Sequence, residues 1–114
     1  MATEAKTGAT YLSEGQAGHT LANDAIARLG CLSSLKILDR DLTSAPGSPT
    51  EGDTYLIAAS PTGVWSTDIG AGAGKLAFYN NGWKYITPQG GMIAFVNDEK
   101  IWICYSSVES AWFP

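Results

Sequence analysis

The stretch FYNNGWKYITP, residues 78–88, decides the fold, because it places two aromatic segments on either side of a tight turn. Asn80, Asn81 and Gly82 tolerate the positive φ angles that short hairpin connections require. The flanking aromatic and β-branched residues are typical of strands. The sequence therefore predicts an antiparallel hairpin with strands at residues 76–79 and 83–87.

The end of the chain, WICYSSVESAWFP at residues 102–114, follows the same plan. In both places a lysine precedes an apolar strand that ends in tyrosine, and a polar turn and a tryptophan follow. We expect these two similar hairpins to lie side by side in one antiparallel sheet. The same kinds of signal predict strands at residues 55–59, 92–96, 101–105 and 111–113.

One segment, HTLANDAIARLG at residues 19–30, has the apolar spacing of a helix. Leu32 and Leu35 continue the stripe, so the predicted helix covers residues 19–36. The small, polar residues before it are expected to form an arm. The predicted fold is mainly β: an N-terminal arm (1–18), one α-helix (19–36) and a small antiparallel β-sheet or barrel-like domain of hairpins (37–114).

Most of the predicted strands are apolar on both faces, as in Leu76–Tyr79 and Ile101–Tyr105. A half-solvated antiparallel strand would alternate apolar and polar residues. One helix and a few loops cannot cover both faces of such a sheet. We therefore expect either a closed barrel or sandwich, or burial against other copies of the chain. The candidate surface for self-association is the helix stripe of Leu21, Ala25, Leu29 and Leu32.

Charge and hydropathy exclude two classes of partner. The chain of 114 residues suits one domain and carries a net charge of −4. Its seven lysines and arginines are scattered, whereas nucleic-acid binding needs a basic cluster. No apolar run approaches the ~20 residues of a membrane span. The N-terminal sequence lacks the apolar core of a signal peptide, so we expect synthesis in a cytoplasm and retention there until release.

Groups that could support catalysis are few. His19 is the only histidine, and a triad or a zinc site needs partners around it. The segment GAGAGK at 70–75 resembles a phosphate-binding loop, but Ile69 and Leu76 stand where that loop needs Gly and Ser or Thr. Acidic pairs lie in turns, where acids are ordinary. The sequence predicts no catalytic residue, no metal site and no cofactor, and therefore no enzyme.

Cys31 and Cys104 are the only cysteines. Their spacing forms no metal motif. Two small buried thiols are expected, since the inferred compartment is reducing.

The aromatic residues leave two interpretations open. Trp and Tyr rings can stack on sugars, and neutral turns such as NNG and SSVES can bond hydroxyl groups. The same rings can equally form the core or a subunit interface. The candidate contacts for a glycan or a partner are Trp65, Tyr79, Trp83, Tyr85, Trp102, Tyr105 and Trp112.

A set of landmarks along the chain resembles a small family of uncharacterised domains found in bacteriophages, prophages and the gene transfer agents of alphaproteobacteria. The landmarks are EGQA, the ND-AIARL helix, SP-EGD-Y followed by IAA, TGVW, YNNGW, TP--G and the closing aromatic hairpin. The resemblance covers about residues 13–113.

Members of that family often begin longer fibre or spike proteins, so the resemblance implies a virion component such as a head fibre, tail fibre or spike base. It implies a homo-oligomer, with three copies as fibre components commonly have, and an arm at 1–18 that binds another virion protein. It transfers no catalytic residue. The sequence stops after the last hairpin, which favours a decoration, adaptor or base over a receptor-binding protein.

Overall fold

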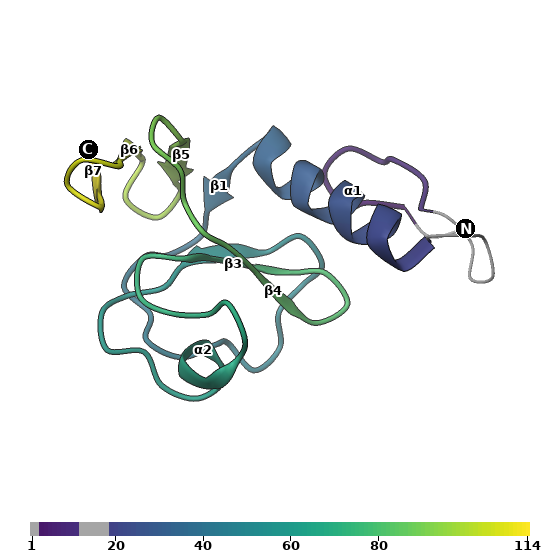
Figure 1. Ribbon diagram of the computed structural model, residues 1–114, viewed down its shortest axis with the longest axis horizontal. Helices are drawn as coiled ribbons and strands as arrows, with labels where there is room; N and C mark the ends of the chain where they lie inside the picture. The colour runs from purple at the N-terminus through teal and green to yellow at the C-terminus, as the bar shows by residue number, and fades with distance from the viewer. Residues whose placement is uncertain (1–2, 12–18) are drawn as a thin grey trace. The chain divides into compact units, whose positions relative to one another are not determined.

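A computed structural model describes residues 3–11 and 19–114, which fall into an N-terminal unit, residues 1–34, and a C-terminal unit, residues 35–114 (Figure 1). The N-terminal unit contains α1 (His19–Ser33). The side chain of His19 and residues 12–18 of the expected arm lie outside the described residues.

In the N-terminal unit, residues 3–11 form a compact turn closed by a bridge between Thr3 and Thr10. The carboxylate of Glu4 holds the turn together by accepting hydrogen bonds from the backbone N–H of Lys6 (3.0 Å) and of Thr7 (2.7 Å) and from the Thr7 hydroxyl (2.8 Å). Glu4 is buried. Its carboxylate occupies the space that a side chain at Gly30 would need. The turn therefore packs on α1 at Gly30.

Lys6 lies in the same turn and caps the C-terminal end of α1. Its ammonium donates to the carbonyls of Cys31 (3.0 Å) and Ser34 (2.9 Å). The last carbonyls of a helix have no partner within the helix, and a cation there also favours the helix dipole. Part of the predicted arm is thus folded against the helix, while its binding to another virion protein stays a prediction.

The C-terminal unit contains two small sheets, and the mainly β fold with one N-terminal helix is confirmed. One sheet has the order β1-β5-β6-β7 and the other β2-β3-β4. The first consists of β1 (Lys36–Ile37), β5 (Ile93–Val96), β6 (Ile101–Ser106) and β7 (Ala111–Phe113). The second consists of β2 (Thr54–Leu56), β3 (Leu76–Tyr79) and β4 (Trp83–Ile86).

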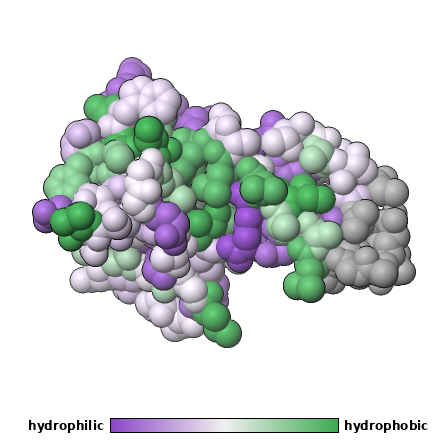
Figure 2. Space-filling model, turned by 45° about the horizontal axis from the view of Figure 1, so that its top comes forward, coloured by the Kyte–Doolittle hydropathy of each residue, from purple (hydrophilic) through white to green (hydrophobic). Residues whose placement is uncertain are grey.

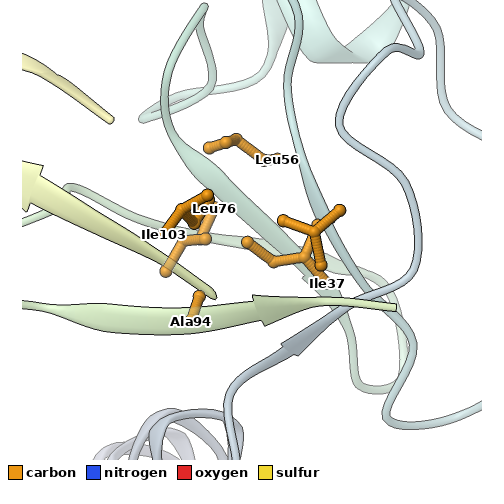
Figure 3. Close-up of a cluster of buried hydrophobic side chains, with 6 residues drawn as sticks. Ile37, Leu56, Leu76, Ala94 and Ile103 are labelled. Atoms are coloured by element: carbon orange, nitrogen blue, oxygen red, sulfur yellow. The ribbon is translucent and has the colours of Figure 1, made fainter. Parts of the chain in front are cut away.

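The two similar hairpins lie in different sheets, so the prediction of one sheet is wrong. The first, β3–β4, pairs with β2, and the second, β6–β7, pairs with β5. Lys36, predicted as the last residue of the helix, instead begins β1, which runs parallel to β5. The reason is burial: both sheets supply residues to one hydrophobic core (Figure 3). That core consists of Ile37, Leu56, Leu76, Ala94, Val96 and Ile103.

A second core covers the other face of the β2-β3-β4 sheet. It is formed by Ile57, Trp65, Ala77 and Tyr85. Trp65 comes from α2 (Val64–Thr67), a single turn of helix that the sequence analysis does not predict. Such a short helix has no apolar periodicity to reveal it. With both faces of β3 covered, the lack of alternation in LAFY is explained.

Candidate functional site

The predicted self-association stripe on α1 is exposed. Leu21 and Leu29 are 82% and 68% exposed, and Ala25 and Leu32 are also exposed. These positions recur at i, i+4, i+8 and i+11, so they share one face of the helix. The residues of α1 that are buried, Ala27, Gly30 and Cys31, lie on the opposite side. Whether the stripe contacts another copy stays a prediction.

A second apolar surface lies on the β1-β5-β6-β7 sheet, and we call it the outer sheet face. Cross-strand pairing places Ile93 beside Cys104, Phe95 beside Trp102, and Cys104 beside Phe113. Phe95 and Trp102 form an edge-to-face pair with centroids 5.1 Å apart. Trp102 and Ile93 are 65% and 59% exposed. Figure 2 shows that hydrophobic side chains are exposed on the face of the molecule that it presents.

In the single chain the strands β5 and β6 are covered on one face only. Burial of their other face against another copy of the chain, which the sequence analysis leaves open, stays a prediction. Cys31 is buried as expected, but Cys104 is exposed, so the prediction of two buried thiols is wrong for Cys104. The cause is the two-residue period of a strand. Ile103 points into the core, so its neighbour Cys104 must point outward.

The predicted aromatic contacts separate into three places. Trp65 and Tyr85 are buried in the second core. Trp83 lies against that core and makes edge-to-face contacts with Trp65 (5.5 Å) and Tyr79 (5.4 Å). The hydroxyl of Tyr85 donates to Asp68 at 2.6 Å. Burial, together with this hydrogen bond, raises the pKa of Tyr85 well above its ordinary value, so the phenol stays protonated and structural.

Trp102 belongs to the outer sheet face, while Tyr105 and Trp112 line a cleft in the C-terminal unit. The cleft has a volume of about 590 Å³ and is bordered by residues from the ends of both sheets. The Tyr105 and Trp112 rings meet edge-to-face at 5.3 Å. The Trp112 indole Nε1 donates to the carbonyl of Gly74 at 3.1 Å, which fixes the ring in place.

Two polar groups of the cleft come from the ends of the β3–β4 hairpin. Lys75 precedes β3 and Thr87 follows β4, and the Lys75 ammonium donates to the Thr87 hydroxyl at 3.0 Å. Both residues line the cleft, as does Ser110. Among the lining residues Lys75 is the only charged one. The sequence prediction missed Lys75 and Thr87. The register that makes them neighbours could have been read from the NNG turn.

A group of carboxylates also lies in turns of the C-terminal unit. Asp39, Asp41 and Asp98 place oxygen atoms within 4.8 Å of one another. The neighbouring Arg40 and Glu99 form a bidentate ion pair. The Nε and Nη2 groups of Arg40 donate to the two carboxylate oxygens of Glu99 at 2.7 and 2.8 Å. The hydrogen bond from Arg40 holds the pKa of Glu99 below its ordinary value. Exposed turn acids of this kind do not by themselves indicate a metal ion. The absence of a metal site stays a prediction.

No helix among the described residues is both long and apolar enough to cross a membrane. No curated protein and no solved structure matches the chain. A family model for proteins of unknown function, DUF2793, matches residues 22–112. Because this match runs from the first turn of α1 into β7 and so spans most of the sequence, the chain belongs to the DUF2793 family.

Proposed function

We propose that the chain is a structural protein of a bacteriophage virion, a fibre, spike or decoration component, that assembles as a homo-oligomer. The resemblance of its landmarks to domains of phages and gene transfer agents supports the virion assignment. The observation that carries the assembly is the exposed stripe of Leu21, Ala25, Leu29 and Leu32 on α1. The proposal places the chain in the particle after synthesis in the host cytoplasm, and it assigns no catalytic activity.

The leucines of the stripe supply most of the energy of the proposed assembly. Full burial of a leucine side chain contributes roughly 1.5–3 kcal/mol. Leu21 and Leu29 gain only the smaller part of this in a single chain, since most of each residue is exposed. A partner that covers the stripe recovers this energy. The spacing suits a helix partner, because residues four and three apart form the seam of helix bundles. A second copy supplies an identical helix, and three helices around an axis bury all three stripes.

The outer sheet face gives a second surface for a neighbour. Its apolar residues are contiguous through the register of β5, β6 and β7. Contiguous exposed apolar patches mark interaction sites more often than isolated residues do. We assign this face to contacts with further virion proteins. The segment 1–18 is assigned the same role, with residues 3–11 held on α1 by Glu4 and Lys6.

The test of assembly compares charge substitutions on and off the stripe. Leu21→Glu combined with Leu29→Glu is expected to turn the oligomer into monomers in analytical ultracentrifugation. Ile69→Glu is the matched control, because Ile69 is fully exposed and belongs neither to the stripe on α1 nor to the outer sheet face. An oligomer that survives the double substitution contradicts the helix interface. For the virion assignment, particles purified from the host are expected to contain the chain by mass spectrometry, and its absence from them contradicts that assignment.

A second candidate function is a carbohydrate-binding module that contacts host glycans. The cleft favours it, since Tyr105 and Trp112 line a site with hydroxyl and ammonium groups beside them. Binding sites for small molecules combine such aromatic walls with a few polar groups. Weakened sugar binding on Trp112→Leu, with an unchanged oligomer mass, supports this function. A loss of the oligomer on the same substitution favours the structural function alone.

A further inference from the structure

The cleft of the C-terminal unit has the opposite sign of charge from the protein as a whole. The chain carries a net charge of −4, yet the only charged group that lines the cleft is the ammonium of Lys75. No carboxylate lies among the lining residues to neutralise it. A ligand with one negative charge therefore completes a pairing that the cleft leaves open.

Lys75 is also held ready for such a ligand. Its ammonium has three donors, and the bond to Thr87 at 3.0 Å uses one of them. This bond fixes the ammonium at the end of the β3–β4 hairpin, beside the cleft wall. A phosphate monoester carries nearly two negative charges at neutral pH, more than one lysine balances. A carboxylate carries one charge and accepts two hydrogen bonds side by side.

The remaining walls favour a ring that bears hydroxyl groups. The Trp112 indole is fixed by its bond to Gly74 and by its contact with Tyr105. An aromatic surface fixed in this way binds the apolar face of a ring at low entropic cost. Thr87 and Ser110 place hydroxyls at the same cleft, where they can exchange hydrogen bonds with ligand hydroxyls.

We propose that this cleft binds a sugar that carries a carboxylate, with the sugar ring against Trp112 and the carboxylate at the ammonium of Lys75. The proposal rests on the carbohydrate-binding function and names its ligand class. A uronic acid residue of an acidic polysaccharide has this chemistry.

The test uses two ligands that differ in one group. Methyl β-glucuronide and methyl β-glucoside share the ring and differ by a carboxylate against a hydroxymethyl group. Each is titrated into the full-length protein, and the backbone signals and the four tryptophan indole N–H signals are followed by NMR. We expect the Trp112 indole to shift with the glucuronide, and the glucuronide to bind about twofold to fivefold more tightly than the glucoside, as an exposed charge pair allows.

The variants separate the charge from the fold. Lys75→Gln is expected to remove the preference for the glucuronide, so that the two sugars bind with equal affinity, and Lys75→Arg is expected to keep the preference. Lys36→Gln is the matched control, because Lys36 is an exposed lysine on β1 and does not line the cleft. Equal binding of both sugars to the unmodified protein overturns the carboxylate assignment and leaves the carbohydrate-binding function standing.

Two further outcomes complete the test. Sodium acetate that binds as tightly as the glucuronide overturns the role of the sugar ring. If neither sugar shifts the Trp112 signal, both the inference and the carbohydrate-binding function fail, and the structural function is unaffected.

Discussion

The indole Nε1 of Trp112 donates a hydrogen bond to the carbonyl of Gly74 at 3.1 Å, although 38 positions separate the two residues in the sequence. The bond joins β7 of one sheet to the loop that leads into β3 of the other. It therefore supports both the packing of the two sheets and the wall of the cleft.

This bond predicts a measurable contribution to stability. Trp112→Phe keeps an aromatic ring but removes the donor, and we expect it to lower the free energy of unfolding by about 1 kcal/mol or more. Trp102→Phe, on the exposed outer sheet face, should change it by less than about 0.5 kcal/mol. Urea unfolding followed by circular dichroism measures both. Equal effects of the two substitutions contradict a structural role for the bond.

Replacing Gly30 by alanine is expected to change the stability in the opposite direction from the usual Gly→Ala substitution in a helix. In a helix interior Gly→Ala normally stabilises by about 0.5–1 kcal/mol. Here a side chain at Gly30 meets the carboxylate of Glu4, so Gly30→Ala should destabilise the N-terminal unit. In the background of Glu4→Ala the same change should become stabilising. Thermal unfolding of the four proteins of this cycle measures the coupling, and a stabilising Gly30→Ala in the unmodified chain contradicts the contact.

Glu4 also predicts a dependence on pH. Burial acts to raise the pKa of its carboxyl, but the hydrogen bonds from Thr7 and Lys6 outweigh burial and lower the pKa below 4.5. A carboxyl with a lowered folded-state pKa contributes stability that is present above the unfolded value and is lost as pH falls through the folded value. The amide protons of residues 6 and 7 should therefore lose their protection against hydrogen exchange as the pH falls below about 4.5.

Glu4→Gln provides the control for that pH dependence. The glutamine keeps an acceptor oxygen but does not ionise. The hydrogen-exchange protection of residues 6 and 7 in this variant should therefore vary little between pH 5 and pH 3. An unmodified protein that keeps full protection at residues 6 and 7 down to pH 2 would contradict the role of the carboxylate.

The two thiols should differ in reactivity. Cys104 is exposed on the outer sheet face and Cys31 is buried in the N-terminal unit. Reagents reach exposed thiols far faster than buried ones. In the monomer produced by Leu21→Glu and Leu29→Glu, one thiol should react with a disulfide reagent at once, and the second only on unfolding. Peptide mapping identifies the labelled residue, and rapid labelling of Cys31 contradicts the burial of the helix face that carries it.

The sequence predicts much of this fold because several elements carry their own signals. The strands Leu76–Tyr79 and Ala111–Phe113 have the bounds that the sequence predicts. The turn between β3 and β4 has positive φ angles at Asn81 (50°) and Gly82 (118°), as its NNG sequence requires. Local turn chemistry and aromatic content suffice for such hairpins.

Other features depend on contacts that no local pattern encodes. The two-residue strand β1 exists because it pairs with β5, far along the chain. The helix α1 ends at Ser33, before its predicted end, where Lys6 binds the nearby carbonyls of Cys31 and Ser34. Which hairpin joins which sheet is likewise decided by the shared core and not by either hairpin alone.

The candidate site shows the same division. The aromatic content identified Tyr105 and Trp112 as candidate contacts. It identified Trp65 in the same way, although Trp65 is buried in the second core. Sequence cannot separate a core ring from a cleft ring, because both satisfy the same strand and loop preferences. Lys75 lines the cleft only because the two sheets pack together, and no local sequence pattern reveals that packing.

The most direct test of the central claim is the mass of the purified chain in solution, measured by light scattering over a series of protein concentrations. Exposed Leu21 and Leu29 predict association, with three times the 12.0 kDa mass of one chain as the expected value. A mass of 12.0 kDa at every concentration would contradict the claim that copies of this chain cover one another's helices.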